Sequence, residues 1–431
     1  MPFTRRDFLR RGTLFMGMGI TAPTFLTTTA RALAVGPEPC ATGAGSKRIL
    51  VVVQLGGGND GLNTVVPYAD PLYAQARPRL AIAESDVLAV SDRVGFNPAL
   101  APLKGLLDSG HLALLQGVGY PNPNRSHFRS TDIWVTGQPE SYEETGWLGR
   151  YLDAQCSGED RRLHAADIGT TVSRLFWTGQ SIVPAISSIE TFGLEADARF
   201  PDDQSNQVET LKLLNGGTGG NDYDDYIRRV ALEAIATSDD LKRITRGYTS
   251  TVDYPTTGFA AGLKTIAKVI QGDLGTRIFH ITLGGFDTHA AQANVHGALL
   301  QTVAEGIQAF MRDLESLGRA DDVMVMTFSE FGRRVAENAS GGTDHGAAAP
   351  LWLIGGGLTS GIVGDHPSLD DLDDGDLKFG IDFRGVYGTI LRDWLGVDPA
   401  PIIGTGSFAD LGFVRDPATA EPVAIASIAA D

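Results

Sequence analysis

The chain has 431 residues, of which 42% are hydrophobic and 20% charged, which suits a globular protein with the core of one large domain or two. Its formal charge of −17 and pI of 4.9 mean that it repels nucleic acid and anionic lipid, so we expect no nucleic-acid partner. Two cysteines, Cys40 and Cys156, could form one disulfide but exclude a disulfide scaffold and a zinc–thiolate site.

The first 34 residues have the pattern of an export signal. Arg5 and Arg6 in TRRDFL match the twin-arginine motif, an apolar stretch broken by Gly, Thr and Pro follows, and ARALA ends the segment. The alternative interpretation is a basic N-terminal helix. We expect cleavage after Ala34, transport by the twin-arginine translocation machinery, a periplasmic or extracellular location, and no permanent membrane span.

Apolar runs alternate with amphipathic helices in the remainder of the chain. Residue spacings of three and four predict helices over 259–270 and 303–317. Continuous apolar runs predict buried strands at the start of 47–63 and at 111–116, 277–283, 322–328 and 351–354. This alternation predicts an α/β/α sandwich with a mostly parallel central sheet, whose ligands gather at the carboxyl ends of the strands.

Two segments depart from this alternation. We expect residues 47–431 to form one domain, with an irregular insertion or cap around 178–275 that carries a helix over about 223–247. The acidic segment 365–379 lacks the ligand spacing of an EF-hand, which favours a solvated loop over a calcium site.

Reactive side chains, including groups suited to metal binding, follow the predicted strands directly. Asp60 stands in LGGGNDGLN after the first strand, and Ser126 stands at a predicted helix start after the second. Arg125 and Arg129 flank Ser126 and could hold the oxygens of an oxyanion. For each segment a bland alternative exists: a tight turn for the first and a helix N-cap for the second.

Three later segments add carboxylates and imidazoles. The candidates are Asp287 and His289 in GGFDTH, Glu330 and Arg333 in SEFGRR, and Asp344 and His345 in GGTDHG. Taken one at a time, each of these segments could instead be a capped helix start, a surface histidine or a polar turn. Because four strand exits deliver such groups to one edge of one sheet, we expect a metal site there.

In this order, the segments LGGGNDGLNTVVPY, NRSHF, GGFDTH, SEFGR and GTDHG resemble a large exported family of unknown function. That family is placed with the alkaline phosphatase and sulfatase superfamily, and the resemblance covers nearly all of the mature chain. It implies an α/β sandwich, one or two divalent metals, and a Ser or Thr nucleophile that attacks phosphate or sulfate esters. Segment 381–397 resembles the superfamily's closing strand–turn–helix.

The resemblance also implies roles for individual residues. Ser126 would be the nucleophile, with Arg129 and Arg333 in the catalytic site. The metal ligands would be drawn from Asp60, Asp287, His289, Glu330, Asp344 and His345, and would hold Zn²⁺, Mn²⁺ or Ca²⁺.

Three departures from the superfamily leave the function open. Only Thr288 separates Asp287 from His289, Phe331 takes the position of an expected histidine, and the sulfatase signature that matures to formylglycine is absent at Ser126. The first hypothesis is therefore an exported metal-dependent hydrolase of phosphate or sulfate esters. The alternative is a catalytically degenerate exported protein of the same fold with a binding or assembly role.

Overall fold

The computed structural model describes residues 47–155, 163–178, 181, 183–189, 192, 201–216, 222–406 and 408–415. The predicted signal segment and both cysteines lie outside the described residues.

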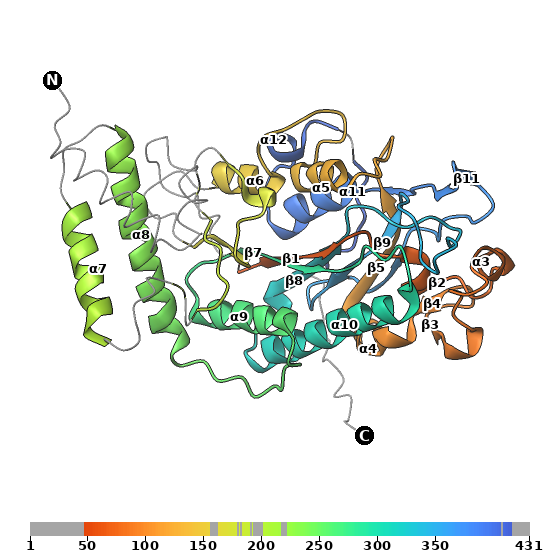
Figure 1. Ribbon diagram of the computed structural model, residues 1–431, viewed down its shortest axis with the longest axis horizontal. Coiled ribbons are helices and arrows are strands. Elements are labelled where there is room, and N and C mark those ends of the chain that lie inside the picture. Colours follow the sequence, from red (N-terminus) through yellow and green to blue (C-terminus); the bar gives the residue numbers. More distant parts are fainter. Residues whose placement is uncertain are drawn as a thin grey trace.

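A mostly parallel sheet forms the centre of the molecule (Figure 1). Its strand order is β10-β5-β9-β8-β1-β7-β6, with β13 pairing with β5. The strands are β1 (Ile49–Gly56), β5 (Leu112–Gly119), β6 (Ala165–Ile168), β7 (Ile278–Gly284), β8 (Val323–Phe328), β9 (Ala349–Ile354), β10 (Gly361–Val363) and β13 (Ile381–Asp382).

Strand β1 lies inside the sheet and pairs in parallel with both β7 and β8. Its sequence, ILVVVQLG, is a continuous apolar run because both of its faces are buried. Strand β9 pairs antiparallel with β5 and β8, whereas the other pairs of this sheet are parallel. The expected α/β architecture and the five predicted strands are confirmed.

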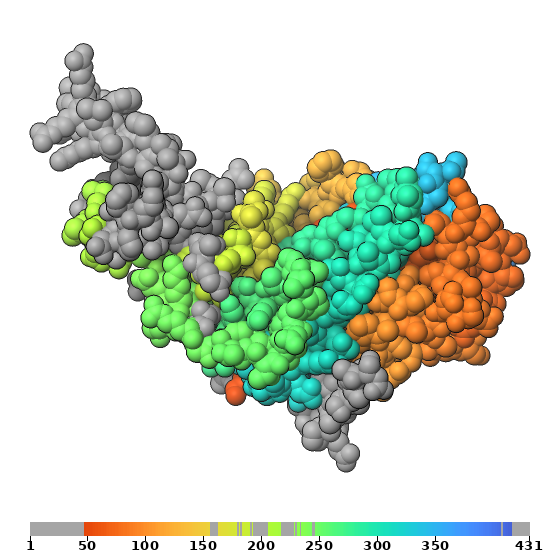
Figure 2. All heavy atoms as spheres, turned by 60° about the horizontal axis from the view of Figure 1, so that its bottom comes forward, coloured from red at the N-terminus to blue at the C-terminus, as the bar shows by residue number. Residues whose placement is uncertain are grey.

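Helices cover both faces of the sheet and bury two separate apolar cores (Figure 1). One face carries α5 (His127–Thr136), α6 (Trp147–Gln155), α11 (Phe383–Thr389) and α12 (Ala400–Ile403). The other face carries α4 (Ala101–Asp108), α9 (Gly258–Gly272) and α10 (Gln292–Ser316). Figure 2 shows α9 and α10 side by side, and their apolar residues at spacings of three and four face the sheet.

Smaller elements lie at the two ends of the sheet. Helices α7 (Pro201–Asn215) and α8 (Asp222–Thr245) pack together beyond α9, at the opposite end from β11 (Figure 1). The elements at the β11 end are β2 (Val65–Val66), α3 (Pro71–Ala76), β3 (Leu88–Ala89), β4 (Gly95–Phe96), β11 (Leu372–Asp373) and β12 (Asp376–Leu377). Among the described residues, no helix combines the length and the apolar character needed to cross a bilayer.

Candidate metal centre

Loops from five parts of the chain meet at one edge of the sheet. Strands β1, β7 and β8 end there, and helix α5 begins there. Because β9 runs against its neighbours, the segment that precedes it reaches the same edge. The sheet therefore brings together the loop after β7, the loop after β8 and the segment 341–348, as the sequence predicts.

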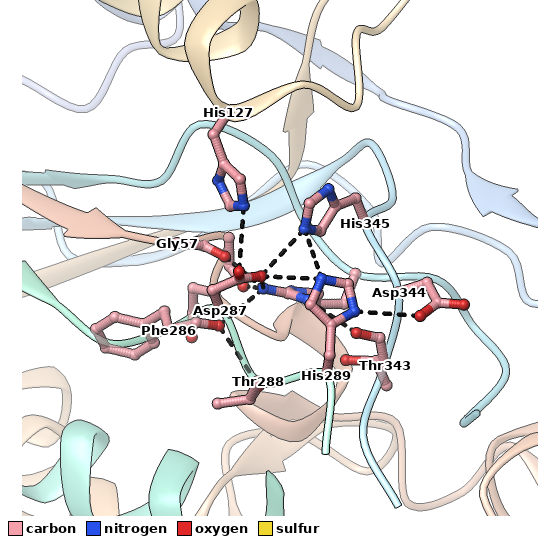
Figure 3. A network of polar contacts seen from close by, with 12 residues as sticks. Gly57, His127, Phe286, Asp287, Thr288, His289, Thr343, Asp344 and His345 are labelled. Carbon is pink, nitrogen blue, oxygen red and sulfur yellow. Dashed lines mark hydrogen bonds and ion pairs between the residues drawn. The ribbon is translucent and has the colours of Figure 1, made fainter. Parts of the chain in front are cut away.

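Asp287 lies at the centre of a cluster that we call the metal centre, which consists of His127, Asp287, His289 and His345 (Figure 3). Asp287 Oδ1 is 3.1 Å from His289 Nε2 and 3.1 Å from His345 Nε2. Asp287 Oδ2 is 3.4 Å from His127 Nε2, and the two Nε2 atoms of His289 and His345 are 2.9 Å apart. One carboxylate and three imidazoles thus converge on one point.

Hydrogen bonds at the Nδ1 atoms orient the rings of His345 and His289. His345 Nδ1 is 2.8 Å from the backbone carbonyl oxygen of Arg125, which can only accept. His289 Nδ1 is 3.2 Å from Asp344 Oδ1, and a hydrogen bond from Asn338 lowers the pKa of that aspartate. Both Nδ1 atoms therefore face hydrogen-bond acceptors, and both Nε2 atoms point toward Asp287.

The third imidazole is held in the same way by Glu330. His127 Nδ1 is 2.9 Å from Glu330 Oε1, which also accepts a hydrogen bond of 2.9 Å from the backbone N–H of Gly57. The carboxylate is buried, with only 4% of its side chain exposed, so its position is well defined. His127 Nδ1 therefore faces an acceptor, and its Nε2 also points toward Asp287.

The cluster has the residue types and the spacing of a candidate metal site. The ligand atoms of His127, Asp287 and His345 all lie within 4.8 Å of one another. His289 Nε2 lies 3.1 Å from Asp287 Oδ1 on the same side of the cluster. Imidazole and carboxylate groups are ligands that a divalent metal ion takes in proteins.

The centre is open to solvent on one side. The exposed side-chain fraction is 20% for His345, 34% for His127, 44% for His289 and 47% for Asp287. The open side therefore leaves room for water or another ligand to approach the cluster.

Arg333 holds Asp287 in place through a hydrogen-bonded ion pair. Its buried guanidinium donates to Asp287 Oδ1 at 2.8 Å and to the carbonyl oxygens of Phe286 and Thr343 at 2.9 and 2.8 Å. Burial alone would raise the pKa of Asp287, but the contacts with Arg333 and His345 outweigh it and lower the pKa to about 2. Arg333 thus keeps the carboxylate ionised and joins the two loops that carry the ligands, instead of facing a substrate.

The glycines after β1 make close contact with these loops possible. A Cβ on Gly57 would lie 2.4 Å from the backbone nitrogen of Asp287, and a Cβ on Gly58 would lie 2.4 Å from the Phe331 ring. Both glycines have a positive φ, which other residues rarely adopt. The glycine-rich loop after β1 therefore packs closely against the loops of the metal centre. This is the segment in which the sequence predicts Asp60 as a ligand.

Asp60 does not reach the metal centre, and its predicted role as a ligand is corrected. It is fully buried, and its Oδ2 accepts a hydrogen bond of 2.6 Å from Arg77 and another from Gln292. This ion pair uses the carboxylate inside the protein, and contacts with Arg77 outweigh the effect of burial and lower the pKa of Asp60. The Asp60 side chain also accepts a hydrogen bond from the backbone N–H of Asn63, and so caps the short 3-10 helix that follows it.

The two other predicted carboxylates hold imidazoles instead of contacting the centre of the cluster. Glu330 holds His127 and Asp344 holds His289, both through Nδ1. Neither carboxylate oxygen contacts Asp287, so these two residues orient the ligands. Glu330 and Asp344, predicted as ligands, therefore position imidazoles instead, whereas Asp287, His289 and His345, also predicted as ligands, lie in the cluster.

Ser126 lies at the N-cap of α5, directly before His127, and its exposed side chain makes no capping hydrogen bond. Its backbone N–H donates to Asn124 Oδ1 at 2.9 Å. Arg129 turns elsewhere: it pairs with Asp132 at 2.7 Å and donates to backbone carbonyl oxygens near residue 140. Its predicted place at the catalytic site is therefore corrected, whereas that of Ser126 stays a prediction.

His127 is the one residue of the centre that the sequence did not indicate as a ligand. In the segment NRSHF the sequence indicates Ser126 as a functional residue. It does not indicate His127, which is the first residue of helix α5. Phe331 is buried against the same centre, with its ring 4.9 Å from His127 and 4.5 Å from His345 between centroids. The apolar Phe331 ring thus lies beside the centre, at the position where the resemblance implies a second histidine.

The fold and the site define an α/β protein with a candidate histidine–carboxylate metal centre at the carboxyl edge of its sheet. The chain belongs to the family described as "Protein of unknown function (DUF1501)", whose family model matches residues 115–402. Among curated proteins no match was found.

Several solved structures are similar to this chain at low identity. The lipoteichoic acid synthase LtaP from Listeria monocytogenes is 11% identical, with a TM-score of 0.38 over 92% of this chain and 82% of that one. A protein in the alkaline phosphatase superfamily from Vibrio parahaemolyticus is 11% identical, with a TM-score of 0.37 over 88% and 77%. The C-terminal periplasmic domain of EcEptC from Escherichia coli, solved in complex with Zn, is 11% identical, with a TM-score of 0.38 over 90% and 96%.

Proposed function

We propose that this protein is an exported, metal-dependent hydrolase of phosphate or sulfate esters. The observation that carries the proposal is the convergence of three Nε2 atoms on the Asp287 carboxylate, with every Nδ1 beside an acceptor. A cation at this point would be bound by these groups, and the open side of the cluster would leave room for a substrate.

The ligand set favours zinc. Imidazole nitrogens suit Zn²⁺ and other transition metals, whereas Ca²⁺ takes oxygen ligands almost exclusively. His127, His289, His345 and Asp287 would hold the ion. A divalent metal in this position supplies Lewis acidity, which stabilises negative charge on the oxygens of the group being transferred.

The residues around the centre have separate tasks in this proposal. Ser126, exposed and adjacent to His127, would attack the phosphorus or sulfur atom as the nucleophile while the bond to the ester oxygen breaks. The alcohol would leave with the serine proton, and water would then release the phosphate or sulfate from Ser126. The first N–H groups of α5, at residues 127–129, have no partner within the helix and would bind the anionic oxygens. Arg333 would keep Asp287 ionised and in place.

Turnover of chromogenic phosphate and sulfate esters by the zinc-loaded protein tests this proposal. We expect activity in the wild type, its loss in Ser126→Ala with zinc still bound, and full activity in Ser85→Ala, which removes an exposed serine elsewhere. A zinc-loaded wild type that turns over none of these esters would contradict the hydrolase.

Phe331 favours a second candidate, a binding or assembly protein that keeps the metal centre without turnover. Its ring occupies a wall of the centre where a second metal's ligand is expected, so only one ion would be held. Under this candidate zinc binds with the same affinity in Ser126→Ala, and the wild type shows no ester turnover.

A further inference from the structure

An acidic hairpin packs against two arginines, Arg125 and Arg334, that come from segments next to the metal centre. Asp374 and Gly375 connect β11 to β12, and their φ angles of 51° and 84° are those of a two-residue hairpin turn. The turn places Asp374 and Asp376 against two arginines from other parts of the chain. The sequence predicted a solvated acidic loop here, and the structure shows instead that part of it is paired.

The two arginines are Arg125 and Arg334, and Asp374 joins them. A single oxygen, Asp374 Oδ2, lies 3.1 Å from Arg125 Nη1, 3.1 Å from Arg125 Nη2 and 3.3 Å from Arg334 Nη2. Asp376 Oδ2 is held more tightly, at 2.8 Å from Arg125 Nε and 2.6 Å from its Nη2. The two guanidinium groups therefore converge on one carboxylate oxygen.

The two aspartates differ in how firmly they are held. The side chain of Asp376 is 2% exposed, whereas that of Asp374 is 77% exposed. Arg125 and Arg334 are themselves 36% and 34% exposed, so an ion in solvent can reach both. Because exposed ion pairs contribute little to stability, Asp374 can leave its place at low cost, while Asp376 stays and positions Arg125.

The paired arginines adjoin the metal centre through their own backbones. The carbonyl oxygen of Arg125 is the acceptor that holds His345 Nδ1 at 2.8 Å. The backbone N–H of Arg334 donates to the carbonyl oxygen of Asp344 at 3.0 Å. The same two residues whose side chains would bind an anion therefore also contact, through their backbones, the segment that carries His345.

We propose that Arg125 and Arg334 form a subsite for a second tetrahedral oxyanion, a phosphate or sulfate group of a polyanionic substrate. Asp374 occupies this subsite when the substrate is absent, since its carboxylate carries the same charge and accepts from the same guanidinium groups. The inference rests on the proposed function, because it names the substrate class of the same site: an ester that carries an additional anionic group.

Binding of inorganic sulfate, measured by calorimetry at low ionic strength, tests the subsite. Asp374→Asn keeps the positive φ that Asn tolerates and removes the competing charge, so we expect the dissociation constant for sulfate to fall by about threefold or more. Arg334→Gln should raise it by about as much. Asp373→Asn removes an equal charge from the same hairpin without touching either arginine, and should leave it unchanged.

Equal sulfate affinities in Asp374→Asn and Asp373→Asn would overturn the subsite. If Arg334→Gln fails to fold, as a melting curve would show, the two aspartate variants still decide. The same titrations on chelator-treated and zinc-loaded protein separate sulfate on the arginines from sulfate on the metal.

The subsite and the hydrolase can fail separately. Tighter sulfate binding by Asp374→Asn in a protein without ester turnover would support the subsite and contradict the hydrolase. Ester turnover together with unchanged sulfate affinity would do the reverse.

Discussion

Each imidazole of the metal centre owes its orientation to an acceptor that does not contact Asp287. Glu330 serves His127, Asp344 serves His289, and a backbone carbonyl serves His345. The sequence places the carboxylates near the site, but it cannot distinguish a ligand from the group that holds a ligand. That distinction depends on which nitrogen faces which oxygen across segments some 200 residues apart, as for His127 and Glu330.

Replacing Glu330 tests this supporting role. Glu330→Ala removes the acceptor from His127 Nδ1 and should lower zinc affinity about 10- to 100-fold, the usual effect of losing such a partner. Glu330→Gln keeps an acceptor oxygen in the same place and should retain most of the affinity. Competition with a fluorescent zinc chelator measures both, and equal losses in the two variants would argue against a positioning role.

Buried His296 should make the stability of the protein depend on pH. Burial, the largest cause, lowers its pKa to about 4 from 6.5, and its Nε2 lies 2.9 Å from Asn59 Oδ1. Above pH 6.5 the imidazole is neutral in both states. As the pH falls from 6.5 to 4, only the unfolded state takes up the proton, so the free energy of unfolding falls by about 3 kcal/mol in total.

Urea unfolding at pH 7 and pH 5 measures this effect. His296→Gln can still donate to Asn59 but has no titrating group, so its free energy of unfolding should fall less between the two pH values than that of the wild type. The same fall in both proteins would show that other groups, such as the Asp60–Arg77 pair, cause the acid sensitivity.

At the scale of the elements, the sequence predicted the apolar strands well and their directions less well. Strands β1, β5, β8 and β9 are largely apolar runs because both of their faces are buried, and β7 is buried over its first four residues. Strand β6 has only the four residues AADI, which are too few for a pattern. Nor does any local feature state that β9 runs antiparallel, since its apolar run resembles those of its parallel neighbours.

The packing of one loop against another sets the metal centre, and a single glycine tests it. A Cβ on Gly342 would lie 2.3 Å from the backbone carbon of His289, too close for any real contact. Gly342→Ala should therefore displace His289, lower zinc affinity at least about tenfold, and cost about 1–3 kcal/mol of stability.

A matched control is available at the end of β7. A Cβ on Gly284 would meet nothing within 4 Å, so Gly284→Ala should leave zinc affinity and thermal stability nearly unchanged. Equal behaviour of the two alanine variants would mean that the 341–348 segment does not determine the position of His289.

At the scale of the whole molecule, the architecture predicted from the order of segments along the chain agrees with the structure. Composition and periodicity predicted an α/β/α sandwich, and the structure has helices on both faces of a mostly parallel sheet (Figure 1). Composition and periodicity could not predict that Asp60 forms an ion pair with Arg77. An ion pair between buried groups 17 residues apart does not change the periodicity of the sequence.

Export is a property of the whole chain that a double substitution tests. Replacing Arg5 and Arg6 by Lys keeps the charge but breaks the twin-arginine motif, so we expect the full-length precursor to accumulate in the cytoplasm. Cell fractionation and immunoblotting give the result. Unchanged export of the Arg5→Lys/Arg6→Lys chain would contradict the twin-arginine signal.

The metal content of the purified mature protein tests the central claim most directly. Elemental analysis after incubation with zinc and removal of excess metal should find about one zinc per chain in the wild type. We expect the metal to be lost in His345→Ala, which removes a converging Nε2, and retained in His366→Ala, a histidine outside the centre. A folded wild type that retains no zinc, or a His345→Ala protein that retains as much as the wild type, would contradict the metal centre.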